Sequence, residues 1–92
     1  MTKEILSKKE QLFLYLVGTF QSSAMIALGK IENPMTNSTD LNLNQASFYI
    51  SLLDLLQEKT KDNLSEYEEQ RLINTISELK LSLINEKKKN GN

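Results

Sequence analysis

The sequence predicts an all-α, single-domain protein of three helices. Three observations support this: a composition rich in helix-forming residues, two N-terminal capping patterns, and apolar residues at helical spacing. Only three of the 92 residues are glycine and one is proline, while Leu, Ile, Glu, Lys and Gln are abundant. These residues favour helix, and the β-branched and aromatic runs typical of all-β proteins are missing.

The first helix is predicted over residues 8–29. Ser7 and Glu10 form a capping box, in which each side chain can bond the other residue's free backbone N–H. An apolar run without any charged residue follows, and Gly29 is a typical helix stop. Residues 30–41 are polar and contain Pro34, which predicts a loop.

The second helix is predicted over residues 42–60, with Asp40 or Asn42 as its cap. After a tight turn, Ser65 and Glu68 form a second capping box. It begins a third helix over residues 66–88, and residues 89–92 are expected to fray.

The apolar residues exceed what three helices can enclose. The third helix has one apolar face, built on Leu72, Ile76, Leu79 and Leu83. The second is apolar over more than half of its circumference, and the first is apolar nearly all round. Something outside the three helices must therefore cover the surplus.

A second copy of the chain is the simplest cover, because two-fold dimers are the commonest oligomers. The far side of the first helix carries a stripe of small residues that permits close helix approach. We therefore expect a homodimeric helical bundle whose interface runs along Leu14, Gly18, Ser22 and Met25. Alternatively, a different and unidentified protein could cover this surface.

Two further alternatives use the first helix differently, in a membrane-associated or a secreted factor. A membrane span is opposed by the polar residues Thr19, Gln21, Ser22 and Ser23 at its midpoint. A secretory signal is opposed by Glu4 and Glu10, which interrupt the positive region that such a signal needs.

The composition also argues against catalysis and metal binding by this chain. Histidine and cysteine are absent, which removes the commonest general base and the usual transition-metal ligands. Eleven basic and twelve acidic residues give a net charge of −1, which favours no nucleic acid. We expect no enzyme, no metal and no cofactor, and we attribute the carboxylate pair Asp54 and Glu58 to a solvated helix face.

The segment after the second helix has two interpretations. The structural one is a helix stop followed by a turn between helices. The functional one is a partner-binding or anion-binding corner, where Lys59, Lys61 and Asn63 would meet.

Taken together, the chain resembles the family known as domain of unknown function (DUF) 1844, a group of short bacterial proteins. Three stretches in order carry the resemblance, within about residues 11–84. The first stretch is the helix end Ala24-Met25-Ile26-Ala27-Leu28-Gly29, followed by Pro34. The second is the segment from Asp40 to Ala46, which leads to Ile50 and to Leu52 to Leu56. The third is Glu58 to Ser65, followed by Glu68, Glu69, Leu72 and Glu78 to Lys80.

The resemblance implies a small helical cytoplasmic protein and no assigned activity. The chain departs from the family pattern at two places. Asp62 stands where the family usually has glycine, and Lys80, Ser82 and Leu83 stand where it tends to have an arginine-rich stretch with a tyrosine. If that stretch has a shared function, this member lacks it.

Overall fold

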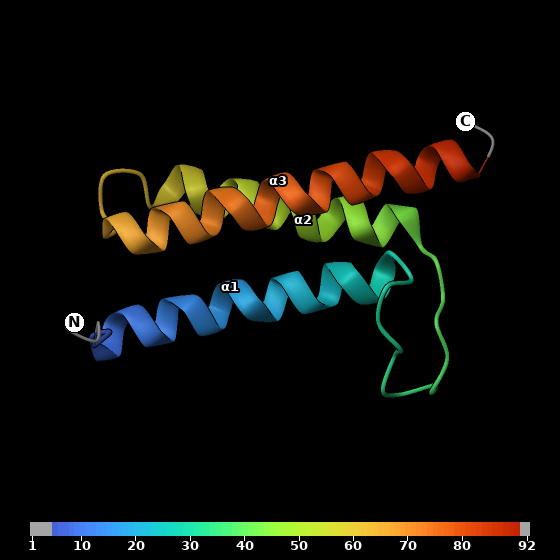
Figure 1. Ribbon diagram of the computed structural model, residues 1–92, viewed down its shortest axis with the longest axis horizontal. Helices are drawn as coiled ribbons and strands as arrows, with labels where there is room; N and C mark the ends of the chain where they lie inside the picture. Colours follow the sequence, from blue (N-terminus) through green and yellow to red (C-terminus); the bar gives the residue numbers. More distant parts are fainter. Residues whose placement is uncertain (1–4, 91–92) are drawn as a thin grey trace.

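The structure, a computed structural model that describes residues 5–90, is an up–down–up bundle of three helices. The helices are α1 (Lys8–Ala27), α2 (Leu43–Lys59) and α3 (Glu66–Lys89). Figure 1 shows α1 and α3 running in the same direction, with α2 antiparallel to both. The bundle is elongated, with principal extents of 46 × 27 × 25 Å. The all-α prediction with three helices is confirmed.

The α1 helix has the predicted start and ends slightly earlier than predicted. Ser7 Oγ accepts from the Glu10 backbone N–H, and Glu10 Oε1 accepts from the Ser7 N–H at 2.9 Å. Leu28 is the C-cap, and Gly29 follows in the left-handed conformation with φ +74°. The Lys30 N–H then bonds the Met25 carbonyl at 2.9 Å. The glycine stop signal thus lies just outside the helix, where left-handed φ is needed.

The ends of α2 resolve the choice between two possible caps. Asn42 is the N-cap, and its side-chain oxygen accepts from the Gln45 N–H at 3.1 Å. At the other end the Thr60 hydroxyl donates to the Leu56 carbonyl at 2.7 Å. Asp40 instead lies in the preceding loop and accepts a hydrogen bond from Ser38.

The α3 helix begins at the predicted second capping box, formed by Ser65 and Glu68. It ends at Lys89, so the first residue of the predicted 89–92 tail is helical, and Asn90 is its cap. The remaining two residues of that tail lie outside the described residues.

The long connection between α1 and α2 forms a small hairpin held by its own hydrogen bonds. The Asn33 N–H donates to the Ser38 carbonyl at 2.9 Å, and the Asn42 N–H donates to the Ala27 carbonyl at 2.8 Å. Asn37 takes the left-handed turn conformation, with φ +56°. The hairpin projects from one end of the bundle (Figure 1) and leaves Met35 exposed.

The core lies between the three helices and is almost entirely aliphatic. Its buried apolar residues are Val17, Ala24, Ala27, Leu28, Ala46, Ile50, Leu53, Leu72, Ile76 and Leu79. Phe13, Phe20, Met25, Tyr49, Leu56, Leu64 and Leu83 pack against it. The predicted apolar face of α3 is therefore the face that the core uses.

Among the described residues, none of the three helices combines the length and the apolar character that a bilayer span requires.

Candidate interaction surface

The outer side of α1 carries a shallow, open groove. It is lined by Tyr15, Gly18, Thr19, Ser22, Ser23 and Ile26. Most of these side chains are small or hydroxyl-bearing, and the Thr19 hydroxyl already donates to the Tyr15 carbonyl. A Cβ atom added at Gly18 would meet nothing within 4 Å, so the groove is open to solvent there.

The structure divides the four residues predicted for a dimer interface. Gly18 and Ser22 line the outer groove of α1. Met25 instead packs against the core, and Leu14 is half-buried. The helical wheel placed these four on one stripe, but it could not locate the flank at which α1 meets its neighbours.

A second surface, where α1 meets α2, is lined mainly by large apolar side chains. A groove there is lined by Phe20, Leu52, Leu55, Leu56 and Lys59. Leu12 and Leu16 precede Phe20 at four-residue intervals on α1, and Phe48 precedes Leu52 by four residues on α2, so these residues continue the groove on both helices. We define the α1–α2 face as Leu12, Leu16, Phe20, Phe48, Leu52 and Leu55.

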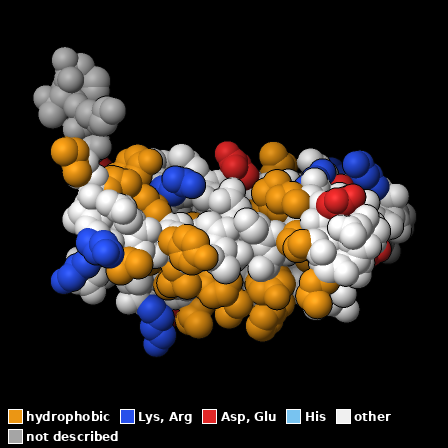
Figure 2. Space-filling model, turned by 90° about the horizontal axis from the view of Figure 1, so that it is seen from below, with side chains coloured by type: hydrophobic (Ala, Val, Ile, Leu, Met, Phe, Trp, Pro, Cys, Tyr) orange, Lys and Arg blue, Asp and Glu red, His pale blue; other side chains and the backbone are white. Residues whose placement is uncertain are grey.

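The α1–α2 face leaves large apolar side chains in water. Leu12 is 59% exposed, Phe48 57% and Leu55 48%. Figure 2, seen from the α1 side, shows hydrophobic side chains gathered along one long edge of the bundle. Val17, next to Leu16 on α1, is by contrast 1% exposed. No sequence signal separates these neighbours, because their burial depends on which flank of α1 the other two helices cover.

The corner after α2 does not bring its two lysines into one pocket. Lys59 lines the α1–α2 groove, whereas Lys61 lines a hollow on the α3 side with Asp54, Glu58 and Glu69. Asn63 is exposed, and its N–H bonds the Thr60 carbonyl at 2.9 Å. This geometry is that of an interhelical turn.

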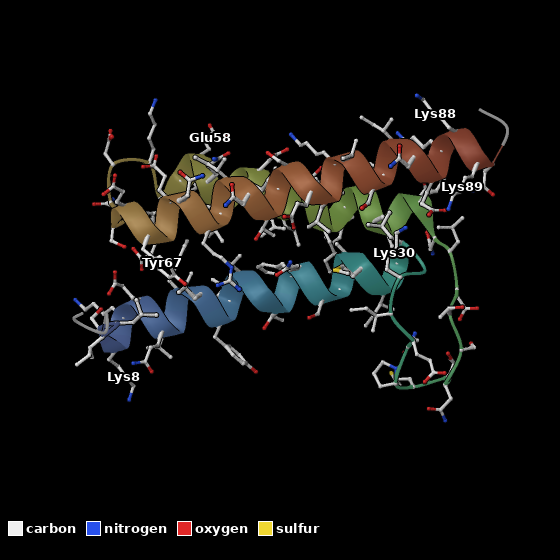
Figure 3. The ribbon with its side chains drawn as sticks, in the orientation of Figure 1. Lys8, Lys30, Glu58, Tyr67, Lys88 and Lys89 are labelled. Atoms are coloured by element: carbon white, nitrogen blue, oxygen red, sulfur yellow. The ribbon has the colours of Figure 1, made fainter. Side chains whose placement is uncertain are left out.

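The most buried ion-paired carboxylate of the described residues lies at the opposite end of the bundle. Glu86 is only 9% exposed, and its carboxylate meets Lys30 Nζ at 3.2 Å and Lys89 Nζ at 3.5 Å. Lys30 and Lys89 lie together at this end of the bundle (Figure 3). The hydrogen bond from Lys30 lowers the pKa of Glu86, and the charge of Lys89 acts in the same direction. The contact ties the start of the loop to the last turns of α3.

The two capping boxes lie side by side, because α1 and α3 are parallel. Glu10, Ser65, Glu66, Tyr67 and Gln70 surround one shallow hollow between these helix starts. The Ser65 hydroxyl lowers the pKa of Glu10, and the Ser7 backbone N–H adds to the effect. The Glu10 carboxylate, which caps α1, therefore also lies beside the start of α3.

Within residues 5–90, no three metal-ligating side chains lie close enough together to hold an ion. Asp54, half of the carboxylate pair on α2, is bridged to Lys80 of α3 at 3.0 Å. This contact accounts for Asp54 as part of the α2–α3 packing.

These features define a small three-helix protein whose most distinctive surface is an apolar helix–helix face. The chain belongs to the family described as "Domain of unknown function (DUF1844)", which matches residues 10–85. The resemblance seen in the sequence is thereby confirmed. No curated protein and no solved structure is significantly similar to it.

Proposed function

We propose that this protein is a non-catalytic protein-interaction or structural module that acts as a homodimer. The observation that supports this is the α1–α2 face, where large apolar side chains of two adjacent helices stay exposed. Scattered exposed apolar residues are normal, but a contiguous patch usually marks an interaction site.

The size of the bundle supports the same proposal. A chain of 92 residues buries only about two-thirds of the surface that its unfolded form exposes. The ten buried apolar residues include three alanines, so the core is modest. Covering a further apolar surface by association would stabilise the folded chain through mass action.

Sedimentation equilibrium of the native chain at micromolar concentration tests the proposal. A dimer gives about twice the chain mass of 10.5 kDa. Thermal unfolding of a dimer would also occur at a higher temperature when the protein concentration is raised. A chain that stays monomeric and melts cooperatively at an unchanged temperature would contradict the homodimer.

A further inference from the structure

We propose that the second copy packs antiparallel on the α1–α2 face, across a two-fold axis perpendicular to the helices. Leu16, Leu52 and Leu55 would then lie near the centre of the interface. This inference rests on the proposed homodimer and adds its location and direction. The outer groove of α1, including Gly18 and Ser22, would stay in water.

The area of the face fits a copy of the chain. Leu12, Leu16, Phe48 and Leu55 are between 40% and 59% exposed. With side-chain areas of about 200 Å², they leave on the order of 400 Å² of apolar surface in water. A standard interface buries about 800 Å² per partner, with an apolar share near 65% at homodimer interfaces. Phe20 and Leu52, which line the groove and are partly exposed, add to this area.

The shape of the face also suits a second copy. The 17 residues of α2 give a face about 25 Å long, at 1.5 Å per residue. An isologous interface needs the same patch on both copies, and it pairs each residue with a symmetry mate. A long face of two helices meets this requirement, because two such faces stack into a four-helix layer.

The charges at the two ends of the face favour the antiparallel direction. Lys59 lines the groove at the end of α2, and the α1 residues at that end of the bundle include Lys8 and Lys9. The exposed Asp40 precedes α2 at the opposite end. A two-fold axis across the face would place the Lys59 end of one copy over the Asp40 end of the other; Lys30, which also lies at that end, is paired with Glu86. A parallel pairing would instead oppose the lysines of both copies, and like charges repel.

The outer groove of α1 offers less to a partner. Four of its six lining residues are glycine, serine or threonine, whereas all six residues of the α1–α2 face are leucine or phenylalanine. Association free energy follows the apolar area removed from water. The second copy therefore gains more on the α1–α2 face.

A matched pair of charge substitutions on α1 tests the location. Leu16 and the adjacent Tyr15 are both exposed, so glutamate at either position should leave the bundle folded. We expect Leu16→Glu to raise the dimer Kd by about 100-fold or more, because it buries a charge in the interface. Tyr15→Glu should change the Kd by less than about threefold. Circular dichroism at 222 nm checks that both variants keep their helical structure, which the comparison of the two Kd values requires.

Cross-linking gives an independent test, since the native chain has no cysteine. Leu55→Cys, Ser22→Cys and Leu81→Cys each place one thiol on a different exposed surface. With a short bismaleimide, we expect covalent dimers from Leu55→Cys alone. Dimers in sedimentation that link only through Ser22→Cys would overturn the inferred face and leave the homodimer standing.

Two further results test the direction and the occupant. Lys59→Glu should weaken the dimer, and adding Asp40→Lys should restore it; no restoration would overturn the antiparallel direction. A native chain that is monomeric in sedimentation would overturn both the homodimer and its location. Flotation of that monomer with phosphatidylglycerol vesicles would assign the face to lipid, also against the proposal.

Discussion

At the scale of single residues, three positions depend on backbone conformation rather than on contacts. Gly29, Asn37 and Asp62 have positive φ, at +74°, +56° and +70°. Glycine and asparagine adopt this region readily, and aspartate does so at some cost. The turn after α2 needs a left-handed residue at position 62, where the resemblance implies a glycine. The turn was predictable from its polar sequence, but the residue that takes positive φ was not.

Asp62 gives the first stability prediction. We expect Asp62→Val to destabilise the fold by about 1–2 kcal/mol, because a β-branched residue is strained in the left-handed region. Asp62→Gly should be neutral or slightly stabilising, since strain is relieved while the unfolded chain gains freedom. Urea unfolding followed by circular dichroism measures both. Equal loss in the two variants would mean that the Asp62 side chain, and not its backbone, holds the turn.

At the scale of helices, the sequence predicted where each element lies and much less about which flank it buries. Capping boxes are local, so Ser7 and Ser65 could be assigned without a structure. Burial depends on neighbours that are distant in sequence. Thr75, which was not predicted for the apolar face of α3, is 3% exposed, and the buried Glu86 is paired with Lys30, a lysine 56 positions earlier. No periodicity argument could find that partner.

Ile76 tests the buried face of α3. It is 6% exposed, whereas Ile73, one turn earlier on the same helix, is 38% exposed. We expect Ile76→Asp to unfold the chain, since an unpaired charge would enter the core at a cost above about 4 kcal/mol. Ile73→Asp should remain folded, with a much smaller loss. Helical circular dichroism at 222 nm distinguishes the two, and a folded Ile76→Asp would place the core elsewhere.

The lowered pKa of Glu86 predicts that the stability of the fold depends on pH. Its folded pKa lies below its ordinary value of 4.5, so the folded state binds fewer protons than the unfolded state in that range. The stability that Glu86 contributes is complete above the unfolded pKa and is lost as the pH falls through the folded pKa. Below about pH 4.5 the Tm should therefore fall.

A glutamine substitution separates this carboxylate from the rest of the chain. Glu86→Gln should lower the Tm at neutral pH and give a shallower fall in acid, with Glu10 still contributing to the slope. Glu78→Gln removes an exposed carboxylate of the same helix and controls for the change in net charge. An acid fall of native steepness in Glu86→Gln would show that its contact with Lys30 does not stabilise the fold.

At the scale of the whole molecule, the surplus of apolar surface was predictable, but its position was not. Composition and the helical wheels required a cover for α1 and α2. They could not show which flank stays exposed, because a helical wheel does not include the neighbouring helices. Once the helices are packed, Val17 is buried and the adjacent Leu16 is exposed. Which flank of α1 stays exposed thus depends on how the three helices pack. The expected dimer contact therefore shifts from the small residues Gly18 and Ser22 to the leucines of the α1–α2 face.

Substitutions at Gly18 distinguish the two possible dimer interfaces, which are the α1–α2 face and the outer groove of α1. Its added Cβ would meet nothing within 4 Å, and glycine inside a helix costs about 1 kcal/mol relative to alanine. Gly18→Ala should therefore raise the stability of the chain by up to about 1 kcal/mol, which corresponds to a Tm increase of several degrees.

Gly18→Leu adds bulk to the outer groove alone. If the second copy lies on the α1–α2 face, this variant keeps the native dimer Kd in sedimentation. If the helices meet along Gly18 and Ser22, the leucine prevents their close approach and the dimer dissociates at micromolar concentration. Both variants are compared with the native chain at one protein concentration, because the Tm of a dimer depends on it.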